Sequence, residues 1–224
     1  MKLGLLLPTF RDDAEDAFAV ATEAEQMGLD GVFAFDHLWP MGSPRRPALA
    51  PFPVLAAVAS RCPSLYVGPL VARVGLVETS KLVEQFSTLA GLAPGRVIAA
   101  LGTGDKLSEA EQVAYGLAHR SADERRQLVG DAIDALSPHM SVWCGAGSPS
   151  TNQLAREHGA EINLWGVAPA AVHELSLEGP VSWAGPLGDD VAATLDGLER
   201  AGATWAVAAA PLKLDELRAW RHAH

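Results

Sequence analysis

The feature that most constrains the fold of this chain is a regular alternation of short apolar runs with longer segments of helical periodicity. Eight runs rich in apolar and β-branched residues predict strands, and at least one amphipathic segment follows each of them. The predicted strands cover residues 2–7, 31–35, 65–71, 96–101, 141–144, 161–165, 181–184 and 204–209. Strands that alternate with helices in this way run parallel and are joined by crossover helices.

Two architectures use this alternation, the closed (βα)8 barrel and the open doubly wound sheet. An open sheet of the dinucleotide-binding kind carries a GxGxxG turn after its first strand, whereas here that strand leads into the sequence PTFR at residues 8–11. We therefore predict an α/β protein with a compact (βα)8 TIM-barrel fold. Residues 1–224 are expected to form a single domain, because barrels of about 200 to 250 residues commonly do so.

Charge and composition exclude several classes of function. The chain has 17 Lys and Arg residues against 27 Asp and Glu, a net charge of −10, and such a surface repels nucleic acid and anionic membranes. No apolar run approaches the roughly 20 residues of a membrane helix, and the short segment before Pro8 lacks a signal cleavage site, so a cytoplasmic location is expected. Cys62 and Cys144 have no CxxC spacing, which argues against a metal site or a disulfide framework.

Polar residues follow two of the predicted strands directly. The second strand ends on Asp36 and His37, and the fourth ends on the sequence GTGD at residues 102–105. Because the carboxyl ends of parallel strands meet at one mouth of a barrel, we expect these residues to lie close together. His37 suits proton transfer near neutral pH and Asp105 could assist it, although a structural histidine and an ordinary turn aspartate remain alternatives.

Two further patterns allow both a functional and a structural interpretation. The sequence GAGSP at residues 145–149 follows the fifth strand and begins a helix, so it predicts either a phosphate site or a simple N-cap at Ser148. Tryptophans on four successive strands, at positions 143, 165, 183 and 205, could wall a flat heterocycle or fill the barrel. Ser108 and Glu111 have the spacing of a helix capping box.

Several of these stretches together resemble the luciferase-like monooxygenase superfamily. The similarity is carried by residues 2–10 (KLGLLLPTF), 25–37 (EQMGLDGVFAFDH) and 94–105 (PGRVIAALGTGD), and by Tyr115 with Gly116. Members of that superfamily are (βα)8 barrels that bind FMN or the deazaflavin F420. The strand-two Asp-His pair and the GTG followed by an acid are most similar to the F420-dependent branch.

The resemblance implies specific roles for residues at the strand ends. His37 and Asp105 match positions beside the reactive carbon of the cofactor. Leu70 and Val71 match a non-prolyl cis peptide that forms a bulge behind the ring, and residues 146–148 match the backbone that holds the cofactor phosphate. The positions implied to contact the cofactor are Asp36, Leu70, Val71, Gly102, Thr103, Gly104, Ala146, Gly147 and Ser148.

The resemblance thus predicts an oxidoreductase that moves hydride between F420, or alternatively FMN, and a small organic substrate. A homodimer is also expected from the family. Loops that are long in family members are shortened here, so one alternative is a non-catalytic or degenerate barrel that binds flavin or serves a structural role. Another is a cofactor-free lyase or aldolase, for which Lys106 is the only lysine near a suitable strand end.

Overall fold

Nine parallel β-strands in the described part of the chain form the wall of a barrel. The computed structural model describes residues 1–40, 42–104 and 108–224. The strands are β1 (Lys2–Leu6), β2 (Gly31–Ala34), β3 (Tyr66–Pro69), β4 (Ala72–Arg73), β5 (Ile98–Gly102), β6 (Ser141–Gly145), β7 (Glu161–Trp165), β8 (Val181–Pro186) and β9 (Trp205–Ala209). Each pairs in parallel with its neighbours in the order β3-β2-β1-β9-β8-β7-β6-β5-β4.

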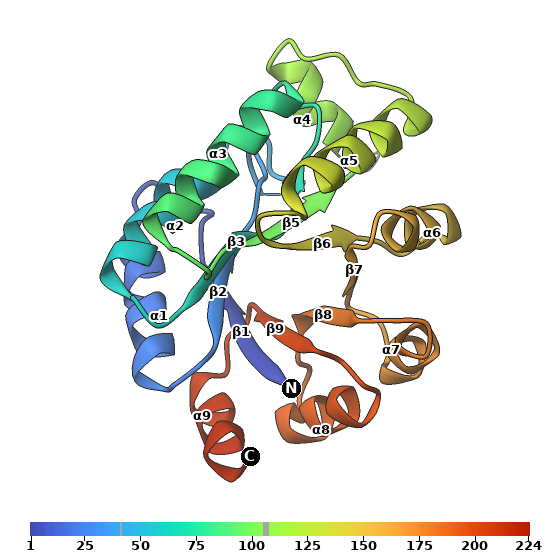
Figure 1. The fold of residues 1–224 in the computed structure, drawn as a ribbon. Helices are drawn as coiled ribbons and strands as arrows, with labels where there is room; N and C mark the ends of the chain where they lie inside the picture. Colours follow the sequence, from blue (N-terminus) through green and yellow to red (C-terminus); the bar gives the residue numbers. More distant parts are fainter. Residues whose placement is uncertain (41, 105–107) are drawn as a thin grey trace.

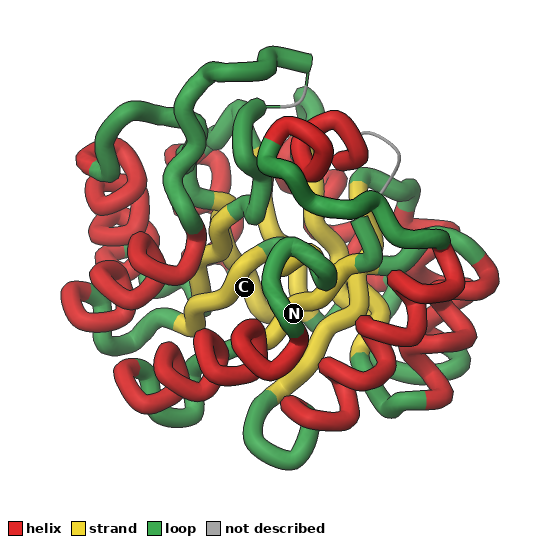
Figure 2. Tube along the Cα trace, turned by 90° about the horizontal axis from the view of Figure 1, so that it is seen from above, coloured by secondary structure: helices red, strands yellow, loops and turns green. Residues whose placement is uncertain are grey.

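Helices surround this wall on its outer side (Figures 1 and 2). They are α1 (Glu15–Gln26), α2 (Pro51–Arg61), α3 (Thr79–Leu92), α4 (Glu109–Ala114), α5 (Ala122–Leu136), α6 (Pro149–Glu157), α7 (Pro169–Ser176), α8 (Val191–Arg200) and α9 (Leu214–Ala223). The predicted (βα)8 barrel is therefore confirmed. Within the described ranges, no helix is long and apolar enough to span a bilayer.

The third predicted strand differs from the expectation of one continuous segment. It is divided into β3, whose ladder partner is β2, and β4, which pairs with β5. The peptide bond between Leu70 and Val71, in the interruption, is cis, as the family resemblance implied. An isolated parallel bridge between Val67 of β3 and Val97, just before β5, closes the ring.

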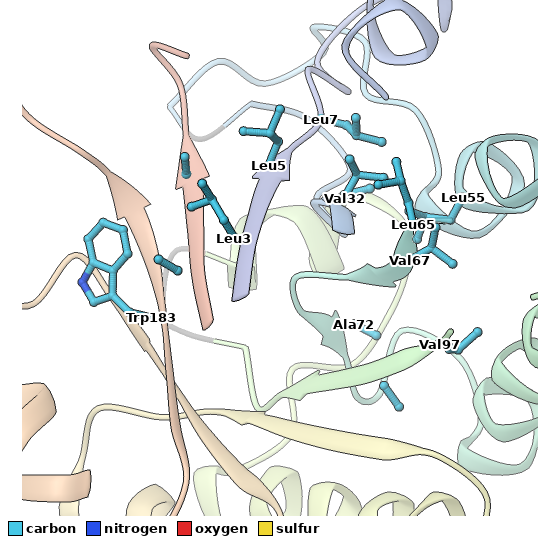
Figure 3. Close-up of a cluster of buried hydrophobic side chains, with 14 of the residues drawn as sticks. Leu3, Leu5, Leu7, Val32, Leu55, Leu65, Val67, Ala72, Val97 and Trp183 are labelled. Carbon is cyan, nitrogen blue, oxygen red and sulfur yellow. The ribbon is translucent and has the colours of Figure 1, made fainter. Parts of the chain in front are cut away.

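Alternation along the strands separates two hydrophobic cores. The outer core lies between the strands and the helices; Leu3, Leu5 and Leu7 enter it from the β1 segment. Figure 3 shows Leu55 of α2 in this layer beside Val67 of β3. Helix packing against one face of every strand thus explains why the apolar runs are nearly continuous.

The inner core fills the barrel with aromatic rings and decides between the two interpretations of the tryptophans. Phe33 stacks on Trp143 at 5.2 Å, and Trp205 meets both rings edge-on at 5.8 and 5.6 Å. Trp183 instead points into the outer core, and Trp165 is 49% exposed. Two of the four tryptophans therefore plug the barrel, and only Trp165 is available to a ligand at the mouth.

Candidate functional site

A cavity of about 360 Å³ lies at the carboxyl ends of several strands. It is lined by Phe35, His37, Leu70, Val71, Arg73, Gly102, Thr103, Gly104, Ser108, Gly145, Ala146, Asn163 and Trp165. Apart from Ser108 at the start of α4, these residues come from the ends of β2, β4, β5, β6 and β7 and from the link between β3 and β4. The ends of the second and fourth predicted strands therefore lie close together, as expected. Cavities of this size suit a small-molecule ligand.

Most, but not all, of the predicted site residues line this cavity. His37, Leu70 and Val71 do so, together with residues 102–104 and Ala146. Gly147 and Ser148 are exposed beside the cavity without lining it, and the partly buried Asp36 lines a neighbouring pocket instead. Asp105 and Lys106 lie outside the described residues, so their predicted roles stay predictions.

His37 is held in place by a buried carboxylate. Its Nδ1 lies 2.8 Å from Oε1 of Glu111, whose side chain is only 1% exposed, whereas His37 is 18% exposed toward the cavity. The second oxygen of Glu111 accepts a hydrogen bond of 2.7 Å from the backbone N–H of Leu38. One carboxylate thus fixes both the imidazole ring and the backbone that follows β2.

Glu111 had been expected to close a capping box with Ser108, and this expectation is wrong. The carboxylate of Glu111 points away from its own helix, toward the loop after β2 and toward Arg73 of β4. Helix α4 places Glu111 on its buried face, while Glu109 on the same helix is exposed. The apparent local motif is therefore a long-range contact that joins three separate elements.

Arg73 lies beneath this network as a nearly buried cation, 4% exposed. Its Nη2 donates to Oε2 of Glu111 at 2.9 Å, and its Nε donates to the carbonyl oxygen of Asp36 at 2.7 Å. Nη1 is buried and has no hydrogen-bond partner within residues 1–40, 42–104 and 108–224. Because buried charges require partners, Arg73 locks β4 to both Asp36 and α4.

Asp36 does not line the cavity but contacts Arg73, which does. Its Oδ2 accepts a hydrogen bond of 2.9 Å from the backbone N–H of Arg73. Burial raises the pKa of the Asp36 carboxyl, and the nearby carboxylate of Glu111 adds to the rise, while Arg73 and His37 oppose it. In the described part of the chain, no group of three or more His, Cys, Asp or Glu side chains is placed to hold a metal ion.

The floor of the cavity is shaped by Val71 and two glycines. A Cβ atom on Gly102 would lie 2.4 Å from Cγ2 of Val71, and one on Gly145 would lie 3.1 Å from Cγ1. Any side chain at these positions would displace Val71, so glycine is required for Val71 to lie flat between β5 and β6. The result is a smooth apolar surface at the base of the cavity.

Aromatic rings form one wall above this floor. Phe35 lies 5.7 Å from Trp165 and 5.8 Å from the imidazole of His37, measured between ring centroids. Phe10 stacks on Phe35 at 5.4 Å and supports it from behind. A flat surface below and aromatic rings at the side suit a planar ligand.

The loop after β6 forms the start of α6 as the sequence predicted. Ser148 is the N-cap, and its side chain accepts from the backbone N–H of Thr151 in a capping box. The N–H groups of Ala146 and Ser148 are already bonded, to Asn163 and Thr151. The N–H of Gly147 makes no hydrogen bond within the described residues, so it is left for an anion at this helix start.

Three residues of the site were not predicted from the sequence: Glu111, Arg73 and Asn163. Arg73 carried a weak signal, since a cation two residues after a predicted buried strand is unusual. Asn163 carried a similar one, as an amide inside the apolar run at residues 161–165. Glu111 had no local signal of its own, because its partners lie 38 and 74 residues away in the sequence.

Curated proteins similar in sequence to this chain include two F420-dependent dehydrogenases. The chain is 32% identical over 171 residues to the F420-dependent glucose-6-phosphate dehydrogenase of Intrasporangium calvum, which covers 74% of this chain and 49% of the relative. It is 31% identical over 137 residues to the F420-dependent hydroxymycolic acid dehydrogenase of Mycobacterium tuberculosis, covering 61% of this chain and 36% of that protein. The matched region therefore spans half or less of the length of these curated relatives.

Solved structures share the fold at low sequence identity. An F420-dependent secondary alcohol dehydrogenase in complex with an F420-acetone adduct superposes with a TM-score of 0.81 at 12% identity, covering 97% of both chains. The F420-dependent tetrahydromethanopterin reductase of Methanopyrus kandleri gives 0.74 at 12% identity, with 97% and 96% coverage. In addition, the family model described as luciferase-like monooxygenase matches residues 1–141. Since this match covers more than half of the sequence, the chain belongs to the luciferase-like monooxygenase family.

Proposed function

We propose that this protein is an F420-dependent oxidoreductase that moves hydride to or from a hydroxyl-bearing carbon of a small organic substrate. The observation that carries the proposal is His37, which is fixed by a buried carboxylate and faces a cavity with a flat apolar floor. The names of the curated relatives and of the solved structures support F420 over FMN, which is the alternative cofactor.

The residues at the cavity fit a deazaflavin ring. Val71, held flat against Gly102 and Gly145, offers the surface on which a planar ring can lie. Thr103 and Gly104 extend this surface along the end of β5, and Trp165 borders it. When bound there, F420 would supply the two-electron hydride chemistry, which no side chain of the protein can supply itself.

His37 would handle the proton that accompanies hydride transfer. Because its Nδ1 is hydrogen bonded to the Glu111 carboxylate, Nδ1 carries a hydrogen and Nε2 is the nitrogen that can exchange a proton with a ligand. In the direction of alcohol oxidation, Nε2 accepts the proton of the substrate hydroxyl. In the direction of carbonyl reduction, it returns that proton to the oxygen. Asp105 remains a proposed partner in this step.

The other predicted positions take supporting roles in this proposal. Gly147, with its unpaired N–H at the start of α6, would bind the cofactor phosphate, and Ala146 and Ser148 would shape the loop around it. Asp36 would act as a positioning residue, because it reaches the cavity only through Arg73. Leu70 would support Val71 beneath the ring.

We also propose that the protein assembles as a homodimer and is located in the cytoplasm. A homodimer is supported by an apolar groove between α2 and α3, which Phe52, Ala56, Leu89 and the half-exposed Leu92 line. A single barrel domain in the cytoplasm remains the expected setting. A non-catalytic flavin-binding barrel is the second candidate, favoured by the shortened loops around the mouth.

Titration of the purified protein with F420 and with FMN, followed by cofactor fluorescence, tests the proposal. We expect saturable binding of F420, and turnover with hydroxyl substrates that falls about 10²- to 10⁴-fold in His37→Ala while affinity for F420 is kept. His158→Ala is a matched control, because His158 also pairs through Nδ1 with a carboxylate, Asp134, at 2.7 Å but lies away from the cavity. Binding of neither cofactor would contradict the proposal, and binding without any turnover would favour the non-catalytic candidate.

A further inference from the structure

Asn163 places a buried amide in the wall of the cavity. It lies in the middle of β7, is 4% exposed and lines the cavity. Its neighbours Ile162 and Leu164 point into the outer core, so Asn163 points into the barrel. A buried amide destabilises a protein unless its polar atoms are paired, which makes its hydrogen bonds informative.

Ser182, the residue paired with Asn163 across β8, determines which way the amide points. Nδ2 of Asn163 donates to Oγ of Ser182 at 3.1 Å, and that hydroxyl lies 3.4 Å from the carbonyl oxygen of Ile162. The carboxyl of Glu161 also hydrogen bonds with Ser182. A hydroxyl has one hydrogen, and both the Ile162 carbonyl and the Glu161 carboxylate are acceptors for it, so Oγ accepts from the Asn163 NH2 group.

This orientation turns Oδ1 of Asn163 away from Ser182 and toward the cavity. Within the described residues Oδ1 accepts no hydrogen bond, so a fixed acceptor is presented to whatever binds there. Trp165 lies two residues further along the same face of β7, half exposed and 5.7 Å from Phe35. The acceptor is thus set into a wall that fits the edge of a flat ring.

We infer that Oδ1 of Asn163 accepts a hydrogen bond from the imide N–H at the edge of the deazaflavin or flavin ring. The inference rests on the proposed function, because it requires the ring to occupy this cavity. Both ring systems carry that N–H, so Asn163 recognises the feature that they share. Asn163 is therefore a ring-binding residue whose orientation is set by Ser182.

A double-mutant cycle between protein and ligand tests this hydrogen bond. Asn163→Leu removes the acceptor at similar volume, and F420 methylated at the imide nitrogen lacks the donor. Each change alone should raise the dissociation constant of F420 about tenfold, and together they should raise it little further, because both remove one neutral hydrogen bond. Ser182→Ala leaves Asn163 in place but frees the amide to turn, and should cost about threefold with F420 and nothing with the methylated cofactor.

Thr204→Val is the control for a general disturbance of the polar interior. Thr204 hydrogen bonds with Glu161 and Val181 but does not line the cavity, so its variant should bind F420 as the wild type does. Two outcomes would refute the hydrogen bond while the proposed function stands, provided that the wild type binds F420. In the first, Asn163→Leu binds F420 as tightly as the wild type. In the second, the effects of Asn163→Leu and of cofactor methylation on the dissociation constant add. If Asn163→Leu does not fold, the Ser182→Ala comparison decides in the same way. Failure of the wild type to bind F420 or FMN would instead overturn the proposed function itself.

Discussion

Ionisable side chains lie at both ends of the barrel, buried at the carboxyl end and partly buried or exposed at the amino end, and their partners differ. At the carboxyl end, Glu111 contacts both Arg73 and His37 directly and so joins three elements of the chain. At the amino end, the Glu161 carboxyl accepts from the hydroxyl of Thr204. Lys2 at that end lies over aromatic rings, 4.2 Å from the centroid of Tyr66 and 5.2 Å from that of Trp205.

The difference shows that a partly buried acid with a raised pKa is not by itself evidence of a functional site. Burial raises the pKa of Glu161, and hydrogen bonds from Thr204, Ser182 and Trp143 and the charge of Lys2 oppose the rise. Burial also raises the pKa of Asp36 at the opposite end. The carboxyl end differs because a ligand can reach it: the carboxylate of Glu111 holds the imidazole of His37 at a cavity. The amino end is separated from this cavity by the packed rings of the inner core.

Removing Glu111 should produce the largest effect and tests whether its ion pairs hold the carboxyl end together. Glu111→Ala leaves Arg73 buried without its partner carboxylate, which is expected to reduce the free energy of unfolding by about 3 to 5 kcal/mol. Urea denaturation followed by circular dichroism measures this. Glu109→Ala, an exposed neighbour on α4, should change stability by less than about 0.5 kcal/mol. Equal effects of the two variants would show that the network contributes little.

Adding one methyl group to each end separates stability from ligand binding. A Cβ on Gly102 would meet Val71 at 2.4 Å, and a Cβ on Gly31 would meet the carbonyl oxygen of Tyr66 at 2.9 Å. Each alanine variant should lose about 1 to 3 kcal/mol of stability through overpacking. Only Gly102→Ala should also weaken F420 binding in a fluorescence titration. Weakened binding in Gly31→Ala as well would remove the distinction between the two ends.

The pH dependence of stability tests whether burial raises the pKa of Glu161 at the amino end. The pKa of Glu161 is raised in the folded state. The contribution of this carboxyl to the free energy of unfolding is therefore fully present below its unfolded-state pKa and is lost as pH rises through its folded-state pKa. Glu161→Gln mimics the uncharged acid at every pH, so its stability relative to wild type should increase from pH 4 to pH 7. Turnover should not change. A pH-independent difference between the two proteins would contradict the assigned cause.

The smallest effect is expected from the two thiols, one near each end. Burial raises the pKa of Cys144 to about 11, and burial with the nearby Glu25 carboxyl raises that of Cys62. Neither thiol should react with a disulfide reagent at pH 8 in the folded protein, and both should react in urea. Rapid reaction of one thiol in the native state would reveal local opening at its end of the barrel.

Local patterns in the sequence were sufficient for the barrel and for much of the cavity lining. The alternation of apolar runs and helices determined the architecture, and the polar endings at His37 and at residues 102–104 identified the functional end. The family resemblance supplied the position of the interruption between β3 and β4, which the residues alone did not reveal. The sequence therefore located the cavity to within a few strand ends.

What the sequence could not provide were the contacts between distant segments. Glu111 has the spacing of a helix cap, and only the packing of α4 over the mouth turns its carboxylate toward His37 and Arg73. Trp143 and Trp183 are each the third residue of their strand, yet Trp183 faces the helices while Trp143 faces the interior. Such orientations depend on the phase of each strand, which a shift of one residue reverses.

The divided third strand has a consequence for how this barrel could respond to a ligand. Near the mouth, β3 is bonded only toward β2 and β4 only toward β5, so the hydrogen-bonded ladder changes partners across Leu70 and Val71. A molecule bound against Leu70 and Val71 would contact the ends of both β3 and β4. Amide hydrogen exchange therefore reports ligand binding at this site, because bound ligand should increase protection in β3 and in β4 at the same time.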